Sequence, residues 1–152
     1  LAVSLLLSDP NVALAAAQPA PEAGAPVSVA SEPMFTDIIN RSAALKAVVD
    51  AWSATQMADG AGFTSGETFA TFKAEAMALS AADMQAHLIL EERGTDGDLK
   101  CILRGISEDI PRKIEAVEQA QTASARAVAL SELSYLLNDN VEVITSPPAP
   151  EV

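Results

Sequence analysis

Apolar residues recur every three or four positions along much of the chain, most clearly between Asp98 and Pro148. This stretch contains one apolar stripe before a short polar join and another after it, formed by Leu99, Leu103, Ile106, Ile110, Ile114 and Val117, then by Leu130, Leu133, Leu136 and Leu137. The spacing places one apolar face on each of two helices. Neither helix can bury its face alone, so the pattern predicts two helices that fold back on each other against a further wall.

Two earlier stretches supply that wall. The first helix is predicted to begin near Thr36 and to end at the turn sequence Asp59-Gly60-Ala61-Gly62. Its stripe consists of Phe35, Ile38, Ser42, Leu45, Val49, Trp52 and Gln56. We interpret Trp52, its largest member, as a core anchor rather than a ligand platform.

The second helix is predicted to begin at Thr64 or Ser65, where Thr64 and Glu67 have capping-box spacing, and to end at Gly94. Its inward face contains Phe69, Phe72, Ala76 and Leu79, and continues with Met84, Leu88 and Glu91. Ser80 and Asp83 resemble another helix start, so a break or kink is expected there.

The third helix contains Pro111, which indicates either two consecutive helices or one kinked helix. The fourth is predicted from about Thr122 to Asn138, with Asn138-Asp139-Asn140 as its stop and Val141–Ile144 as a short extended piece. The fold class is therefore all-α, an up-down four-helix bundle with an extended N-terminal arm and a short proline-rich C-terminal tail.

Four segments follow from this pattern: residues 1–17, 18–33, 34–145 and 146–152. They are a signal-like apolar segment, a proline- and alanine-rich arm, the bundle and the tail. The first resembles the hydrophobic part and small-residue cleavage site of an export signal, and is shorter than the roughly 20 apolar residues of a membrane span. With Leu1 in place of a methionine, we expect a piece of a longer precursor; a retained docking arm or shallow anchor is the alternative for this segment.

The net charge of the chain disfavours some classes of binding partner. Nine Lys and Arg residues stand against 21 Asp and Glu residues, for a formal net charge of −12. Nucleic acid and acidic membrane surfaces are disfavoured, because both select clustered bases. A basic protein partner, or a compartment crowded with acidic soluble proteins, is compatible with this charge.

The chain contains few residues that could act in catalysis or bind a metal. Cys101 is the only cysteine and is interpreted as a buried or half-buried thiol, with a reactive or intermolecular thiol as the alternative. His87 is the only histidine and is interpreted as a helix-surface or boundary residue, since no second His, Cys or carboxylate pair lies near it in sequence. We expect no catalytic residue, metal or cofactor, because no nucleophile with its base and no glycine-rich phosphate loop is present.

Four of the nine bases lie on the third predicted helix, at Lys100, Arg104, Arg112 and Lys113. They are the candidate partner-docking residues. The alternative is a solvated helix face with local charge pairs.

The late helical pair, DIPRKIEAVEQA and ALSELSYLLNDNVEVITSPP, together with LAVSLLLSDPNVALAAA, resembles the PsbQ-like extrinsic subunits of photosystem II in red-lineage algae. The likeness spans about residues 35–148. It implies a non-catalytic subunit of the chloroplast thylakoid lumen, peripheral to the membrane, that docks on intrinsic and other extrinsic subunits. Such a subunit stabilises the complex and helps it retain calcium and chloride. The alternative function is a bacterial periplasmic helical-bundle adaptor or binding protein.

Overall fold

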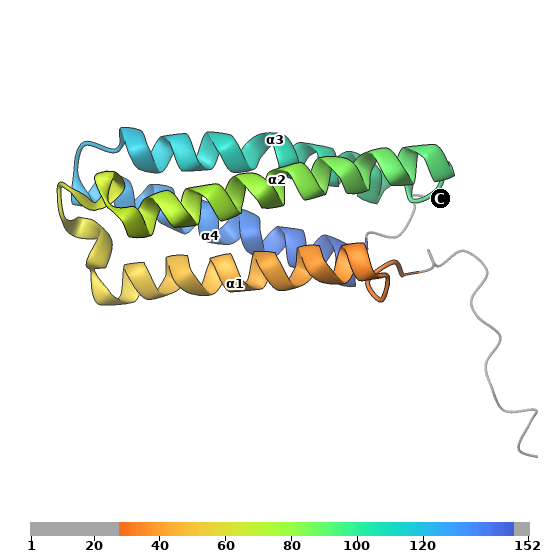
Figure 1. The fold of residues 1–152 in the computed structure, drawn as a ribbon, viewed down its shortest axis with the longest axis horizontal. Coiled ribbons are helices and arrows are strands. Elements are labelled where there is room, and N and C mark those ends of the chain that lie inside the picture. Colours follow the sequence, from red (N-terminus) through yellow and green to blue (C-terminus); the bar gives the residue numbers. More distant parts are fainter. Residues whose placement is uncertain (1–27, 148–152) are drawn as a thin grey trace, which may run out of the picture.

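The computed structural model describes residues 28–147, which form four α-helices, two short 3-10 turns and no strand. The helices are α1 (Pro33–Thr55), α2 (Glu67–Arg93), α3 (Gly97–Gln119) and α4 (Ala123–Thr145); the turns η2 (Met57–Asp59) and η3 (Phe63–Ser65) connect α1 to α2. Successive helices run up and down, so the chain is a four-helix bundle (Figure 1). The predicted signal-like segment, most of the arm and residues 148–152 lie outside the described residues.

One apolar stripe from each helix fills the interior. Every predicted stripe residue of α3 is buried, and so is each stripe residue of α1 except Gln56. The first half of the predicted inward face of α2 is buried as well, but its continuation is wrong, because Leu88 and Glu91 are exposed. At the end of the bundle near η3, Trp52 meets Phe63 and Phe72 edge to face, with ring centroids 4.9 and 4.7 Å apart. Trp52 is therefore a core anchor, as its place in the stripe predicts.

Two predicted helix starts are wrong by a few residues. α1 begins at Pro33 rather than near Thr36, because proline has the backbone angle of a first helical turn and needs no amide partner there. α2 begins at Glu67 rather than at Thr64 or Ser65, since residues 63–65 form the separate turn η3. The predicted end of α2 is confirmed: Gly94 follows Arg93 with a φ of 66°, a backbone conformation that favours glycine.

α4 continues past its predicted stop. It runs to Thr145, so Val141–Ile144 is helical and not extended. The amide of Asn140 is engaged in the interior and Ile144 is fully buried, so tertiary contacts outweigh the weak helix propensity of Asn138-Asp139-Asn140.

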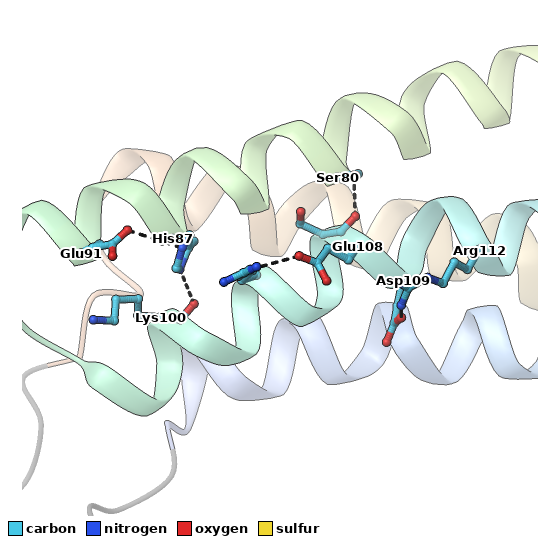
Figure 2. A network of polar contacts seen from close by, with 9 residues as sticks. Ser80, His87, Glu91, Lys100, Glu108, Asp109 and Arg112 are labelled. Atoms are coloured by element: carbon cyan, nitrogen blue, oxygen red, sulfur yellow. Dashed lines mark hydrogen bonds and ion pairs between the residues drawn. The ribbon is translucent and has the colours of Figure 1, made fainter.

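Pro111 lies inside a single helix, α3, and no break interrupts α2 at Ser80. Proline has no amide hydrogen, so the carbonyl oxygen of Ser107, four residues earlier, lacks its helical donor. The buried hydroxyl of Ser80 donates to this oxygen at 2.7 Å (Figure 2). A side chain of α2 thus completes the hydrogen bonding of α3.

Arg126 holds together the end of the bundle that contains η2 and η3. Its guanidinium is buried and donates to the carbonyl oxygens of Ala58, Gly60 and Ala120, at 2.7, 3.0 and 3.3 Å. α4 therefore holds both the turn after α1 and the end of α3.

Replacement of Ser80 by alanine should destabilise the bundle by about 1–3 kcal/mol, because the buried Ser107 carbonyl loses its donor. The loss should shrink in a Pro111→Ala background, where a backbone amide is restored. Urea unfolding followed by circular dichroism would give both values, and equal losses in the two backgrounds would show that Ser80 does not compensate for Pro111.

Candidate functional site

The four predicted docking residues all lie on α3, and three of them pair with acids of this chain. Arg104 meets Glu108 at 3.0 Å and Arg112 meets Asp109 at 2.7 Å, both within α3 (Figure 2). Lys113 reaches Glu132 of α4 at 2.8 Å. Lys100 makes no ion pair within the described part of the chain.

The paired docking residues differ in how much of each side chain is exposed. The side chains of Arg104 and Arg112 are 61% and 68% exposed, whereas that of Lys113 is 33% exposed. Exposed pairs within one helix contribute little to stability, so the two guanidinium groups can exchange their partners for acids of another protein. Lys113 instead links α3 to α4.

The predictions for Cys101 and His87 need correction. Cys101 is exposed, because it lies on the outer side of α3 between the buried positions Leu99 and Leu103. His87 is buried, and its Nδ1 lies 2.8 Å from the carbonyl oxygen of Lys100 (Figure 2). A carbonyl only accepts, so Nδ1 carries the hydrogen and donates it. His87 thereby joins the end of α2 to the start of α3.

A polar cluster that the sequence does not indicate lies inside the bundle. It comprises Ser42 of α1, Asp83 of α2 and Asn140 of α4, all without exposed surface. The Asn140 amide nitrogen donates to Ser42 Oγ at 3.0 Å and to Asp83 Oδ2 at 2.9 Å. Asp83 Oδ1 and Asn140 Oδ1 have no hydrogen-bond donor in the structure. The only sequence signal was the position of Ser42 within an apolar stripe.

Burial raises the pKa of Asp83 to about 8, against a smaller lowering by the hydrogen bond from Asn140. At neutral pH the carboxyl therefore carries a proton. With this proton, the carboxyl of Asp83 can donate a hydrogen bond. Asn140 Oδ1 is a buried acceptor that has no donor. The cluster is consequently a neutral hydrogen-bonded group rather than a buried charge.

Two grooves lie beside α1 on the outside of the described part of the bundle. The larger, about 820 Å³, lies between α1 and α4 and is lined by residues that include Lys46, Asp50, Trp52, Ser131, Ser134 and Tyr135. Asp50 accepts from Lys46 and from Ser134, each at 2.6 Å, and these bonds lower its pKa. Tyr135 is 70% exposed beside them. The smaller groove, about 440 Å³, lies between α1 and α2 over Leu45, Trp52 and Phe72.

Within residues 28–147, no three His, Cys, Asp or Glu side chains gather as a metal site. No helix in the same range has the length and apolarity needed to cross a membrane. Comparisons of the chain with protein-family models, with curated proteins and with solved structures found no match. The fold and surface thus define the class of protein, a four-helix bundle with external grooves and an exposed pair of guanidinium groups.

Replacement of Asp83 by asparagine should remove a pH dependence of stability. The folded state holds the Asp83 proton more tightly than the unfolded state, whose pKa is near 3.8, so this residue makes stability fall as pH rises from about 4 to about 8. The free energy of unfolding of Asp83→Asn, relative to that of the unmodified chain, should therefore increase by about 1.4 kcal/mol per pH unit between these pH values.

Denaturant unfolding at several pH values would measure this advantage. Asp59→Asn, at an exposed aspartate, is the matched control and should show no such growth. A constant difference between the Asp83 variant and the unmodified chain from pH 5 to pH 9 would refute the assignment.

Proposed function

We propose that this chain is a non-catalytic subunit that docks through α3 on a larger assembly. The observation that carries the proposal is the pair of exposed guanidinium groups, Arg104 and Arg112, each held only by an acid of its own helix. They lie two turns apart on α3, so an acidic surface can engage both at once.

The assembly we propose is photosystem II, on its oxygen-evolving lumenal side. The resemblance of the two late helices to PsbQ-like subunits supports this choice, and an all-α bundle is the architecture that the resemblance implies. In this role the chain binds intrinsic and other extrinsic subunits, lies peripheral to the thylakoid membrane and helps the complex retain calcium and chloride. Lys100, which makes no ion pair within residues 28–147, adds positive charge to the same helix.

The double variant Arg104→Glu and Arg112→Glu should weaken binding to photosystem II membranes that have been stripped of their extrinsic subunits. We expect about a tenfold loss at low salt, because two attractive contacts become repulsive, and a smaller loss at high salt. Sedimentation of the chain with the membranes measures binding, and circular dichroism should show unchanged helicity.

Arg41→Glu is the matched control for this experiment. Arg41 also pairs with an acid of its own helix, Asp37, at 2.8 Å and is 43% exposed, but it lies on α1. This variant should bind like the unmodified chain. Equal binding by all three proteins would refute docking through α3, and absence of the unmodified chain from thylakoid fractions would refute the photosystem assignment.

The second candidate is a bacterial periplasmic adaptor or binding protein that uses the groove between α1 and α4. The exposed ring of Tyr135 favours it, because tyrosine combines a large apolar face with a hydroxyl and is enriched at binding surfaces. Here Tyr135→Glu should abolish association with the partner while Arg104→Glu and Arg112→Glu leave it intact. Co-purification of these variants from periplasmic extract distinguishes the two functions.

A further inference from the structure

The four helices form two closely packed pairs. α1 packs most extensively on α4 and α2 packs most extensively on α3, whereas the contact between α1 and α2 is the least extensive among neighbouring helices. We term this contact the α1–α2 seam; Trp52 and Phe72 pack across it, and Ser42 and Asp83 lie further along it. The smaller groove, over Leu45, Trp52 and Phe72, follows the same seam. The bundle therefore loses the least packing when it parts between α1 and α2.

Hydrogen bonds join the helices within each pair. Ser80 of α2 donates to a carbonyl oxygen of α3 at 2.7 Å, and Ser134 of α4 donates to Asp50 of α1 at 2.6 Å. The buried hydrogen bond from Asn140 to Asp83, at 2.9 Å, instead joins α4 of one pair to α2 of the other. The two pairs are thus connected in the interior by a junction that includes an ionisable group.

The geometry of this junction favours a protonated carboxyl. Asp83 Oδ1 and Asn140 Oδ1 are both buried and have no donor among the described residues. Protonated Asp83 can donate a hydrogen bond, whereas its carboxylate only accepts. Loss of the proton leaves unsatisfied oxygens and a negative charge in the interior, at the contact between the two pairs.

Within residues 28–147, the helices around Asp83 supply polar groups but no base to its carboxyl. Burial raises the pKa of Asp83 to about 8, and the hydrogen bond from Asn140 opposes this shift. α1 contributes the hydroxyl of Ser42 to the cluster. On α3, Arg104 is exposed and pairs with Glu108. The charge of an ionised Asp83 is therefore relieved by water rather than by a neighbouring base.

Two other titratable groups lie near the cluster. His87 is one turn further along α2, and its Nδ1 donates to the carbonyl oxygen of Lys100 (Figure 2). Asp139, beside Asn140 on α4, is half-buried, and burial raises its pKa. A pH experiment has to separate both groups from Asp83.

We propose that ionisation of Asp83 opens the α1–α2 seam at alkaline pH while both helix pairs stay folded. The proton passes to the solvent, and the carboxylate gains water as α1 moves away from α2. The other side of the bundle stays closed, because Lys113 of α3 pairs with Glu132 of α4. This device lies inside the bundle and does not use the guanidinium groups of α3, so it goes beyond the docking function and stands without it.

Acrylamide quenching of Trp52 fluorescence between about pH 6 and about pH 9 tests the proposal. Trp52 is the only tryptophan, is 4% exposed and packs on Phe72 across the seam, so its quenching reports opening. In the unmodified chain the quenching constant should rise at least about twofold, with a midpoint at about pH 8. Circular dichroism should show unchanged helicity. A constant that stays flat, or a rise accompanied by loss of helicity, would overturn the proposal.

Two variants remove the ionisable group in different ways. Asp83→Asn keeps the shape of the side chain without its titration and should abolish the rise. The double variant Asp83→Leu and Asn140→Leu replaces the junction with apolar side chains and should abolish the rise as well, so the test does not depend on the folding of one variant. A rise that persists in a folded variant without the carboxyl would overturn the proposal.

Asp139→Asn and His87→Gln are the matched controls. The first removes the neighbouring carboxyl of α4, and the second removes the imidazole but keeps an N–H donor for the carbonyl oxygen of Lys100. Both variants should show the same rise in quenching as the unmodified chain. Loss of the rise in either control would assign the transition to that group and overturn the role of Asp83.

Discussion

Hydrogen bonds between helices engage several of the polar side chains inside this bundle, and these bonds constrain how the helices align. Ser80 of α2 serves the Ser107 carbonyl that Pro111 leaves without a donor. Asn140 of α4 binds both Ser42 of α1 and Asp83 of α2. Apolar stripes alone tolerate sliding by a turn, whereas a displaced hydrogen bond leaves an unpaired polar atom in a dry interior. These contacts therefore fix the register that the stripes leave free.

The buried ionisable side chains are also engaged by hydrogen bonds. Asp83 avoids a buried negative charge by holding a proton. The two terminal nitrogens of the buried Arg126 guanidinium donate to three carbonyl oxygens, whereas its Nε has no partner among the described residues. Most of the remaining bases form ion pairs at the surface, several of them between helices. Surface features left for other proteins within residues 28–147 include two guanidinium groups on α3, a groove beside Tyr135 and a groove over Leu45, Trp52 and Phe72. Each has a different chemistry, so each selects a different kind of partner.

Part of the candidate site follows from the sequence and part does not. The cluster of Lys100, Arg104, Arg112 and Lys113 on one helix could be predicted, because all four lie on one short segment. Their pairing could not: Lys113 reaches Glu132 only because α3 and α4 pack side by side. Cys101 was predicted to be buried or half-buried and is exposed, whereas His87 was predicted at the helix surface or boundary and is buried. Both predictions were wrong because exposure depends on the rotation of a helix about its axis relative to its neighbours.

The sequence by itself determined the four helices and most of the apolar residues on the inner faces of α1 and α3, because a repeat of three and four positions places apolar side chains on one side of a helix. It did not determine the inner face along the second half of α2, where Leu88 is exposed and Asp83 is buried. It could not determine where α4 ends or how Pro111 is accommodated. Local propensity favours a stop at Asn138-Asp139-Asn140, but the hydrogen bonds of Asn140 and the burial of Ile144 extend the helix to Thr145. Only the tertiary structure brings Asp83, Asn140 and Ser42 together, since they are distant in sequence and no local pattern relates a side chain of one helix to its partners on two others.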